Sequence, residues 1–394
     1  MVEAIIIEKK IKEIGECLSN LKYDSNNIGL MGGISGQILF EYHLYIKLNE
    51  NIDNLIFSIE SLYSLISEAN IGLTYSYGMS GVFDVLNYLK VKDFIDDGYQ
   101  DSEFTLNNFF KEKILYDIEN NNLDFLHGSS GILNYLINTT NNENHTDFFL
   151  LNLNLYVEKI TKKDNELISF PSYNYTTNKS KNDINLGLSH GNPAIICLLI
   201  KLFQKTNNLK IEPLIQNLFN TFKIIKNKKN NRVRSIYPYS NNDLNESRLA
   251  WCYGDLGVAS TFWQAGKVFN NQEWKQAALD IMLHASTRLN LEENMVVDAG
   301  ICHGSAGVAH IFNRFYKETN IKEFDIARWY WLKQTINMAT FEDGLAGYKA
   351  WFSKNGWQNE SGFLEGISGI GLVLLGFLSN DIEDLDWDRV LLLS

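Results

Sequence analysis

A short glycine element occurs seven times along the chain and constrains its fold more than any other feature. In each copy the pattern G-x-x-G comes directly before an apolar run such as QILFEY or VAHIF. First glycines of successive copies lie 45 to 63 residues apart, which leaves room for two helices of about 12 to 15 residues and their loops. The copies begin at Gly33, Gly78, Gly128, Gly191, Gly254, Gly304 and Gly366, and Ala194 is the only departure at the second glycine.

The position of these glycines predicts where helices begin. They precede each apolar run rather than follow it, as expected where a helix starts and two backbone segments approach closely. Val258 and Phe262 in one run, and Val308 and Ile311 in another, recur at the four- and three-residue steps of a buried helix. Amphipathic stretches such as 271–288 lie between the runs and predict a second helix in each interval.

This alternation predicts an all-α fold. We expect an inner helix after each glycine element and an outer helix between successive elements, and seven such pairs closed into a ring form an α/α toroid, or barrel. A linear helical solenoid has similar spacing and is the alternative. The intervals next to Gly191 are the longest and segment 169–175 is strand-like, so we expect a small β or loop insertion over residues 160–188. The repeats run through nearly the whole chain, which indicates a single toroid domain over residues 1–394.

Composition excludes several classes of protein. The chain has 35 Lys and Arg against 47 Asp and Glu, a net charge of −12, whereas a nucleic-acid-binding protein normally presents a basic face. The longest apolar run, 367–378, is shorter than the roughly 20 residues of a membrane span, and the apolar patch 4–7 is too short for a signal peptide. The four cysteines form no CxxC pair, which argues against a disulfide framework. We therefore expect a reduced, cytosolic protein.

The residues next to the repeat glycines carry the candidate chemistry. If every repeat begins a helix at the same end of the ring, these residues gather at one mouth. Three of the seven histidines, His127, His190 and His303, stand directly before a repeat glycine, and Cys252 and Cys302 lie in the same elements. Thiols and imidazoles are donors that zinc prefers. Cys252, Cys302 and His303 therefore predict a zinc site whose fourth position is open to water or substrate, as in catalytic sites.

Other residues of the same types are given ordinary roles. Cys17 and Cys197 are expected to be small buried hydrophobes. His127 is equally compatible with a simple capping role. The four histidines outside the repeat positions are expected to be surface or core residues: His43, His145, His284 and His310. The eight tryptophans all lie after residue 250, and most are expected in the core or lining a groove.

Three short motifs carry a resemblance to a known family. WCYG at 251–254, CHG at 302–304 and SHG at 189–191, together with the glycine repeats, resemble the lanthionine synthetase C family, the lantibiotic cyclases. The resemblance spans Gly33 to Gly369 and implies an α/α toroid of seven inner and seven outer helices. It also implies one zinc ion per chain, held by two cysteines and a histidine that correspond to Cys252, Cys302 and His303.

The resemblance further implies an activity. Members of the family add cysteine thiols to dehydroalanine or dehydrobutyrine in a dehydrated precursor peptide, leader plus core, and so form (methyl)lanthionine thioether rings. His190 corresponds to the acid–base histidine, Asp124 to an aspartate four residues before a repeat glycine, and Arg248 to an arginine four residues before the first zinc cysteine. Asp124 would orient His190, and Arg248 would brace the carboxylate or the enolate oxygen; a structural ion pair is the alternative for both. Ala194 and Pro193 alter the turn beside His190 and leave its placement less constrained.

The expected partners follow from the same resemblance. Because the first repeat lies within 40 residues of the start, we expect a free-standing cyclase that works with a separate dehydratase and an export transporter. Its location would be cytoplasmic, with peripheral association at the inner face of the cell membrane.

Two other functions stay open at this point. One is a zinc-containing protein of the same fold that binds glutathione or another thiol, or transfers it, without cyclase activity. The other is a toroidal glycoside hydrolase, which needs two carboxylates and gives no reason for the paired cysteines. Its candidate carboxylates are Asp124, Asp255, Asp298 and Asp343.

Overall fold

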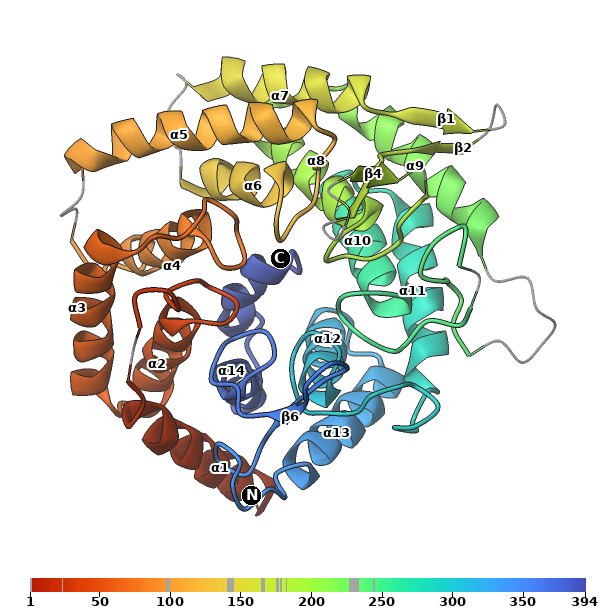
Figure 1. Cartoon of the computed structure of the whole chain (residues 1–394). Helices are drawn as coiled ribbons and strands as arrows, with labels where there is room; N and C mark the ends of the chain where they lie inside the picture. Colours follow the sequence, from red (N-terminus) through yellow and green to blue (C-terminus); the bar gives the residue numbers. More distant parts are fainter. Residues whose placement is uncertain are drawn as a thin grey trace.

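A computed structural model of the chain describes residues 2–22, 24–96, 100–139, 145–163, 167–174, 177, 179–181, 183–226, 234–243 and 245–394. Within these residues, fourteen α-helices alternate between an inner and an outer ring (Figure 1). The inner helices are α2 (Ile34–Leu48), α4 (Met79–Val91), α6 (Ser129–Thr139), α8 (Asn192–Thr206), α10 (Asp255–Val268), α12 (Ser305–Thr319) and α14 (Ile367–Phe377). The outer helices are α1 (Val2–Ser19), α3 (Ile52–Glu68), α5 (Gln100–Glu119), α7 (Thr146–Glu158), α9 (Ile211–Ile225), α11 (Gln272–Ser286) and α13 (Lys322–Asn337).

The ring is closed, so the predicted α/α toroid is confirmed and the linear solenoid is excluded. The last inner helix, α14, packs against both α1 and α2 at the start of the chain (Figure 1). None of the described helices is long and apolar enough to cross a membrane.

Each inner helix begins directly after the first glycine of a repeat, as predicted. The second glycine of a repeat lies against the backbone of the loop before it. A Cβ atom added at Gly307 would lie only 1.9 Å from the carbonyl oxygen of Ile301, closer than any side chain permits. In the six repeats that carry it, the second glycine thus lets the loop fold back onto the first turn of its own helix, and the fourth repeat accommodates Ala194 instead.

The loops before the inner helices are joined into a ring of backbone hydrogen bonds. In each repeat the residue two positions before the first glycine takes part, and such a bond is found at six of the seven junctions between described loops. The N–H to C=O bonds run from Met31 to Ser76, Ser76 to Leu126, Ser189 to Cys252, Cys252 to Cys302, Cys302 to Leu364 and Leu364 to Met31. This ring brings equivalent positions of all seven repeats to one end of the toroid.

Within the described residues, the strands form three small antiparallel hairpins. The predicted insertion near 160–188 contains two of them, and its β character is confirmed for the described residues; residues 164–166, 175, 176, 178 and 182 lie outside them. Its strands are β1 (Thr161–Lys163) with β2 (Leu167–Ser169), and β3 (Ser172–Asn174) with β4 (Lys179–Lys181). The third hairpin, β5 (Ala350–Phe352) with β6 (Gly356–Gln358), lies between α13 and α14 and was not predicted.

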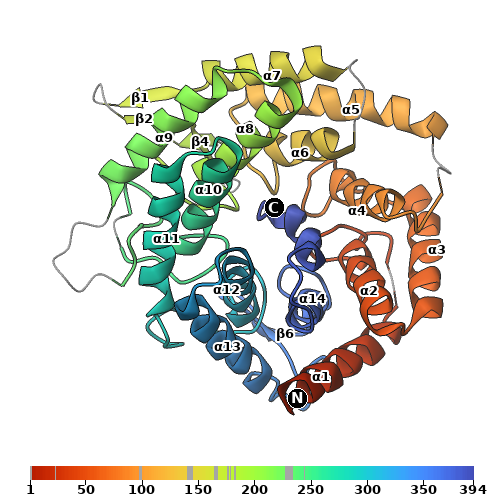
Figure 2. The same cartoon turned by 180° about the vertical axis from the view of Figure 1, so that it is seen from behind.

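The C-terminal segment occupies the middle of the toroid. A 3-10 helix, η2 (Glu383–Leu391), leads the chain into the ring of inner helices, where both views place the C-terminus (Figures 1 and 2). The indole Nε1 of Trp251 donates to the carbonyl oxygen of Leu391 (2.9 Å), and Gln264 Nε2 donates to that of Leu392 (2.6 Å). Trp251 and Trp387 are fully buried there, as expected for core tryptophans.

Candidate metal centre and active site

The loop ring brings the three predicted zinc ligands together. The Sγ atoms of Cys252 and Cys302 and a ring nitrogen of His303 all lie within 4.8 Å of one another. The two cysteines occupy equivalent positions in neighbouring repeats, and the amide of Cys252 donates to the carbonyl oxygen of Cys302 (3.3 Å). Both thiols are free. Two sulfurs and one imidazole are a donor set that suits zinc with one coordination position left over.

The protonation of these groups also fits a cation. The hydrogen bond with Cys302 lowers the pKa of Cys252, and the positive charges of Arg248 and His190 act in the same direction. That same hydrogen bond, together with burial, raises the pKa of Cys302 well above its usual range. Burial lowers the pKa of His303, which favours the neutral imidazole that binds metals. Cys252 is thus the more acidic of the two thiols, and a bound dication would deprotonate both.

A buried carboxyl group completes the surroundings of the three ligands. Glu365 Oε1 lies 3.6 Å from His303 Nδ1, and the Glu365 carboxyl is hydrogen-bonded to the Cys302 thiol. Its Oε2 atom is buried without a hydrogen-bond partner among the residues that the structure describes. Burial, followed by the charges of Asp298 and Cys252, raises the pKa of Glu365 to about 8. A carboxyl oxygen without a partner among acidic groups is an environment that a bound cation would stabilise.

Sequence analysis did not single out Glu365 as a site residue. A signal was available, because Glu365 stands directly before Gly366, the same position that His303 occupies before Gly304. The cysteine position of that repeat is Leu364, which has no metal-binding group, so the element lacked the thiol that marked the other two.

The structure pairs the predicted acid–base histidine with the predicted aspartate. His190 Nδ1 lies 2.7 Å from Asp124 Oδ2, and Asp124 Oδ1 accepts a hydrogen bond from the His127 amide (2.8 Å). Burial lowers the pKa of His190, but the charge and hydrogen bond of Asp124 outweigh burial, so the pKa is raised overall. Burial likewise opposes ionisation of Asp124, but His190 outweighs it and lowers the Asp124 pKa. The pair spans the junction at which no backbone bond joins the described loop residues.

Aromatic rings line the mouth beside this pair. The residues directly before four successive repeat glycines are Tyr77, His127, His190 and Tyr253. The ring centroids of Tyr77 and His127 lie 6.2 Å apart, those of His127 and His190 5.7 Å, and those of His190 and Tyr253 6.5 Å. His127 Nδ1 also lies 2.9 Å from Ser76 Oγ. His127 is thus one ring of a continuous row that leads to the metal ligands.

Arg248 lies on the sulfur side of the site. Its amide donates to the Tyr239 hydroxyl (3.2 Å). Burial lowers the pKa of its guanidinium, but the hydrogen bond with Tyr239 and the charges of Cys252 and Cys302 outweigh burial and raise it. No ion pair joins Arg248 to Asp124 in the part of the chain that the structure describes. Asp124 therefore interacts with His190, whereas Arg248 interacts with Tyr239 and the two thiols.

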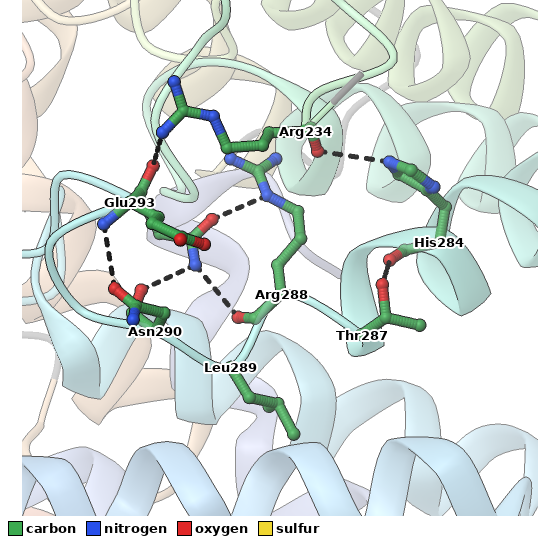
Figure 3. Close-up of a pocket in the computed structure, with 8 residues that line it drawn as sticks. Arg234, His284, Thr287, Arg288, Leu289, Asn290 and Glu293 are labelled. Atoms are coloured by element: carbon green, nitrogen blue, oxygen red, sulfur yellow. Dashed lines mark hydrogen bonds between the residues drawn. The ribbon is translucent and has the colours of Figure 1, made fainter. Parts of the chain in front are cut away.

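A separate cavity lies next to the loop that carries Arg248 and Cys252, and residues that line it hold this loop in place. It has a volume of about 390 Å³ and lies at the end of α11, with Arg234, His284 and Arg288 among its lining (Figure 3). Arg288 is fully engaged, because it donates to Asn294 Oδ1 (2.7 Å), Asp255 Oδ2 (3.0 Å) and the Ser247 carbonyl oxygen (2.9 Å). These contacts hold the 287–294 turn against the loop before α10.

The same contacts weaken the hydrolase alternative. Asp255 is bound in the ion pair with Arg288, and its carboxylate also accepts hydrogen bonds from the amides of Ile236 and Tyr237. Asp343 is exposed and paired with Lys349. Two of the four candidate carboxylates thus have structural partners or lie on the surface.

An α/α toroid with a Cys₂His cluster at its mouth defines the class of protein. The chain matches the family described as Lanthionine synthetase C-like protein over residues 24–392, and it belongs to that family. It is 29% identical over 405 residues to the nisin biosynthesis protein NisC of Lactococcus lactis subsp. lactis, covering 94% of this chain and 90% of NisC. Its fold is similar to that of a nisin cyclase, with a TM-score of 0.75, 24% sequence identity, and coverage of 98% of this chain and 96% of that one.

Proposed function

We propose that this protein is a lanthionine synthetase, an enzyme that adds cysteine thiols to dehydroalanine or dehydrobutyrine in a dehydrated precursor peptide and so forms thioether rings. Family membership and the similarity to NisC support this activity. The observation that carries the proposal is the convergence of Cys252, Cys302 and His303 at one point of the loop ring, with the His190–Asp124 pair in the adjacent repeats.

The three clustered residues would hold one zinc ion per chain. When bound, such an ion supplies a Lewis acid that keeps a substrate thiol deprotonated. The two cysteines and the neutral His303 match its donor preferences, and the buried oxygen of Glu365 marks the need for a positive charge. Arg248 adds a fixed positive charge close to both sulfurs.

His190 would move the proton of the reaction. Its Nδ1 is held by Asp124, so Nε2 is the nitrogen that takes the proton from the substrate thiol. As the sulfur bonds to the β-carbon, the electrons of the carbon–carbon double bond shift toward the carbonyl oxygen to give an enolate. Nε2 then returns the proton to the α-carbon, and no atom is left over. The negative charge of Asp124 stabilises the imidazolium between the two steps.

The chemistry of the substrate implies its partners. Dehydro residues arise when water is eliminated from serine or threonine, so a dehydration step must precede ring formation, and we propose that a separate dehydratase performs it. We propose a cytoplasmic location beside that enzyme and an export transporter, with peripheral association at the inner face of the cell membrane.

Metal content is the first test. Elemental analysis of the purified wild type should find about one zinc per chain, and Cys302→Ala should lose most of it because two ligands hold zinc poorly. Cys17→Ala is the matched control, since Cys17 lies on α1 away from the loop ring, and it should retain the metal. A wild type without zinc would overturn the metal-dependent mechanism.

Activity is the second test. The wild type should convert a dehydrated precursor peptide to a product with no alkylatable cysteine and unchanged mass, detected by thiol alkylation and mass spectrometry. A parallel reaction with glutathione and a cysteine-free dehydrated peptide separates the alternatives. Transfer of glutathione without ring formation would favour the thiol transferase.

A further inference from the structure

Asp298 occupies a position that another repeat fills with asparagine. It lies six residues before Gly304, is buried, and its Oδ1 accepts a hydrogen bond from the Gly300 amide (3.1 Å). In the fourth repeat, Asn185 lies six residues before Gly191, and its Oδ1 accepts the same bond from Gly187 (2.8 Å). The turn therefore needs only one side-chain oxygen, which an amide supplies without a charge.

The second oxygen of Asp298 faces two other groups. Oδ2 accepts a hydrogen bond from the amide of Trp351 in β5 (2.9 Å), and it lies 3.7 Å from Nε2 of His303. The separation from Nε2 is an ion-pair distance, and a shift of under about 1 Å would make it a hydrogen bond. Because the turn does not require a carboxylate, these two contacts are the reason for one.

The surroundings of His303 distinguish its two ring nitrogens. Nδ1 lies beside Glu365, which is itself hydrogen-bonded to Cys302, so Nδ1 is on the side of the sulfurs. Nε2 lies beside Asp298 on the other side of the ring. Nδ1 is thus the nitrogen available to a metal that the cysteines share.

We propose that Asp298 is the positioning residue of the metal centre. Its Oδ2 accepts the Nε2 proton of His303, which leaves Nδ1 unprotonated and aimed toward Cys252 and Cys302. The bond from the same oxygen to the Trp351 amide ties the β5–β6 hairpin to the metal ligand. This inference rests on the zinc centre of the proposed function, and it follows the general finding that a carboxylate behind a ligating histidine fixes its tautomer and orientation.

The test compares zinc binding by the wild type, Asp298→Asn and Asp343→Asn. Asn at 298 keeps the oxygen that the Gly300 amide needs, but it puts an NH₂ group against Nε2 and the Trp351 amide. Asp343→Asn removes the same charge from an exposed residue and is the matched control. Zinc affinity is measured by competition with a chromophoric chelator, the cobalt-substituted proteins by their absorption spectra, and the metal-free proteins by thermal unfolding.

Asp298→Asn should weaken zinc binding by about 10- to 100-fold and shift the cobalt spectrum, whereas Asp343→Asn should match the wild type. Equal zinc affinity of Asp298→Asn and the wild type would overturn the positioning role and leave the zinc centre intact. A wild type that binds no zinc would instead overturn the centre itself.

A measurement on the wild type keeps the test decisive if the variant does not fold. Nitrogen NMR of the zinc-loaded protein with labelled histidine should find the His303 proton on Nε2. A proton on Nδ1 would contradict the proposal.

Discussion

The amide of Cys252 donates to the carbonyl oxygen of Cys302 at 3.3 Å, so the main chain itself holds the two thiols side by side. The residues are 50 positions apart in sequence and belong to successive repeats. Because this bond is one link of the loop ring, the spacing of the sulfurs depends on closure of the toroid and not on the metal. The site is therefore largely formed before any ion binds, which reduces the cost of ordering its ligands.

Removal of the metal should expose one reactive thiol pair. In protein treated with a chelator, we expect iodoacetamide at neutral pH to modify Cys252 of the Cys252–Cys302 pair first, because its pKa is lowered whereas that of Cys302 is raised. Cys197 should stay unmodified, since burial raises its pKa to about 11 and its thiolate fraction is about 100-fold below that of a thiol with a pKa of 9. Peptide mapping by mass spectrometry measures both, and zinc should protect the pair. Rapid alkylation of Cys197 in folded protein would contradict the structure.

Replacement of Asp124 should change the titration of His190. In Asp124→Asn the charge that outweighs burial is lost, so the His190 pKa should fall. NMR titration of labelled histidine measures this shift, and ring formation should slow in the same variant. Asp243→Asn, a change on the exposed surface, should leave the pKa where it is. An unchanged His190 pKa in Asp124→Asn would show that Asp124 does not control this imidazole.

The second glycine of the sixth repeat, Gly307, should be important for stability. In Gly307→Ala the new Cβ would collide with the Ile301 carbonyl oxygen, and we expect a loss of about 1 to 3 kcal/mol or more in the free energy of unfolding. Gly72→Ala is the control, because nothing lies within 4 Å of the added atom, and it should stay within about 0.5 kcal/mol. Urea unfolding compares the two. Equal stability of both variants would rule out the steric account of the repeat.

His43 should make the protein less stable in mild acid. It is fully buried on α2, and burial, with Asp386 and Asp384 opposing and Lys92 and Lys47 reinforcing, lowers its pKa to about 4. In unfolded protein the pKa is about 6.5, so between pH 6.5 and 4 the unfolded chain binds more protons. The free energy of unfolding should therefore fall as the pH falls through this window, by about 3 kcal/mol from this group.

His43→Phe isolates that contribution. The variant loses the hydrogen bond with the Tyr88 hydroxyl (2.9 Å) at every pH, but it should also lose the part of the pH dependence that His43 causes. Urea unfolding at pH 7.5, 6.0 and 4.5 measures the constant loss of stability and the change in its pH dependence. If the difference between wild type and variant were constant across these pH values, His43 would not titrate as described.

Much of the fold could be predicted because the repeat is a local feature. The glycines report a backbone contact within a single loop, between Gly307 and Ile301 for example, and that contact shows in sequence as a fixed spacing. Equivalent positions of neighbouring repeats lie side by side when the inner helices all begin at the same end of the molecule. For this reason Cys252, Cys302 and His303 could be grouped in advance. The His190–Asp124 pair also joins neighbouring repeats, but it was expected from the family resemblance and not from the ring.

Contacts outside the repeat positions depend on packing and were decided only by the tertiary structure. The approach of the β5–β6 hairpin to Asp298 and the bond from Trp251 to the C-terminal segment leave no periodic trace in the sequence. Arg248 could have paired with Asp124, but the folded loops place its charge beside the two thiols. By itself the sequence determined the number of helix pairs and the residues that precede each inner helix, because sterics of the repeat fix the local backbone. Closure into a toroid was decided by the packing of α14 against α1 and α2. The tertiary structure decided which oxygen faces which ring nitrogen, because such distances arise only when distant segments pack together.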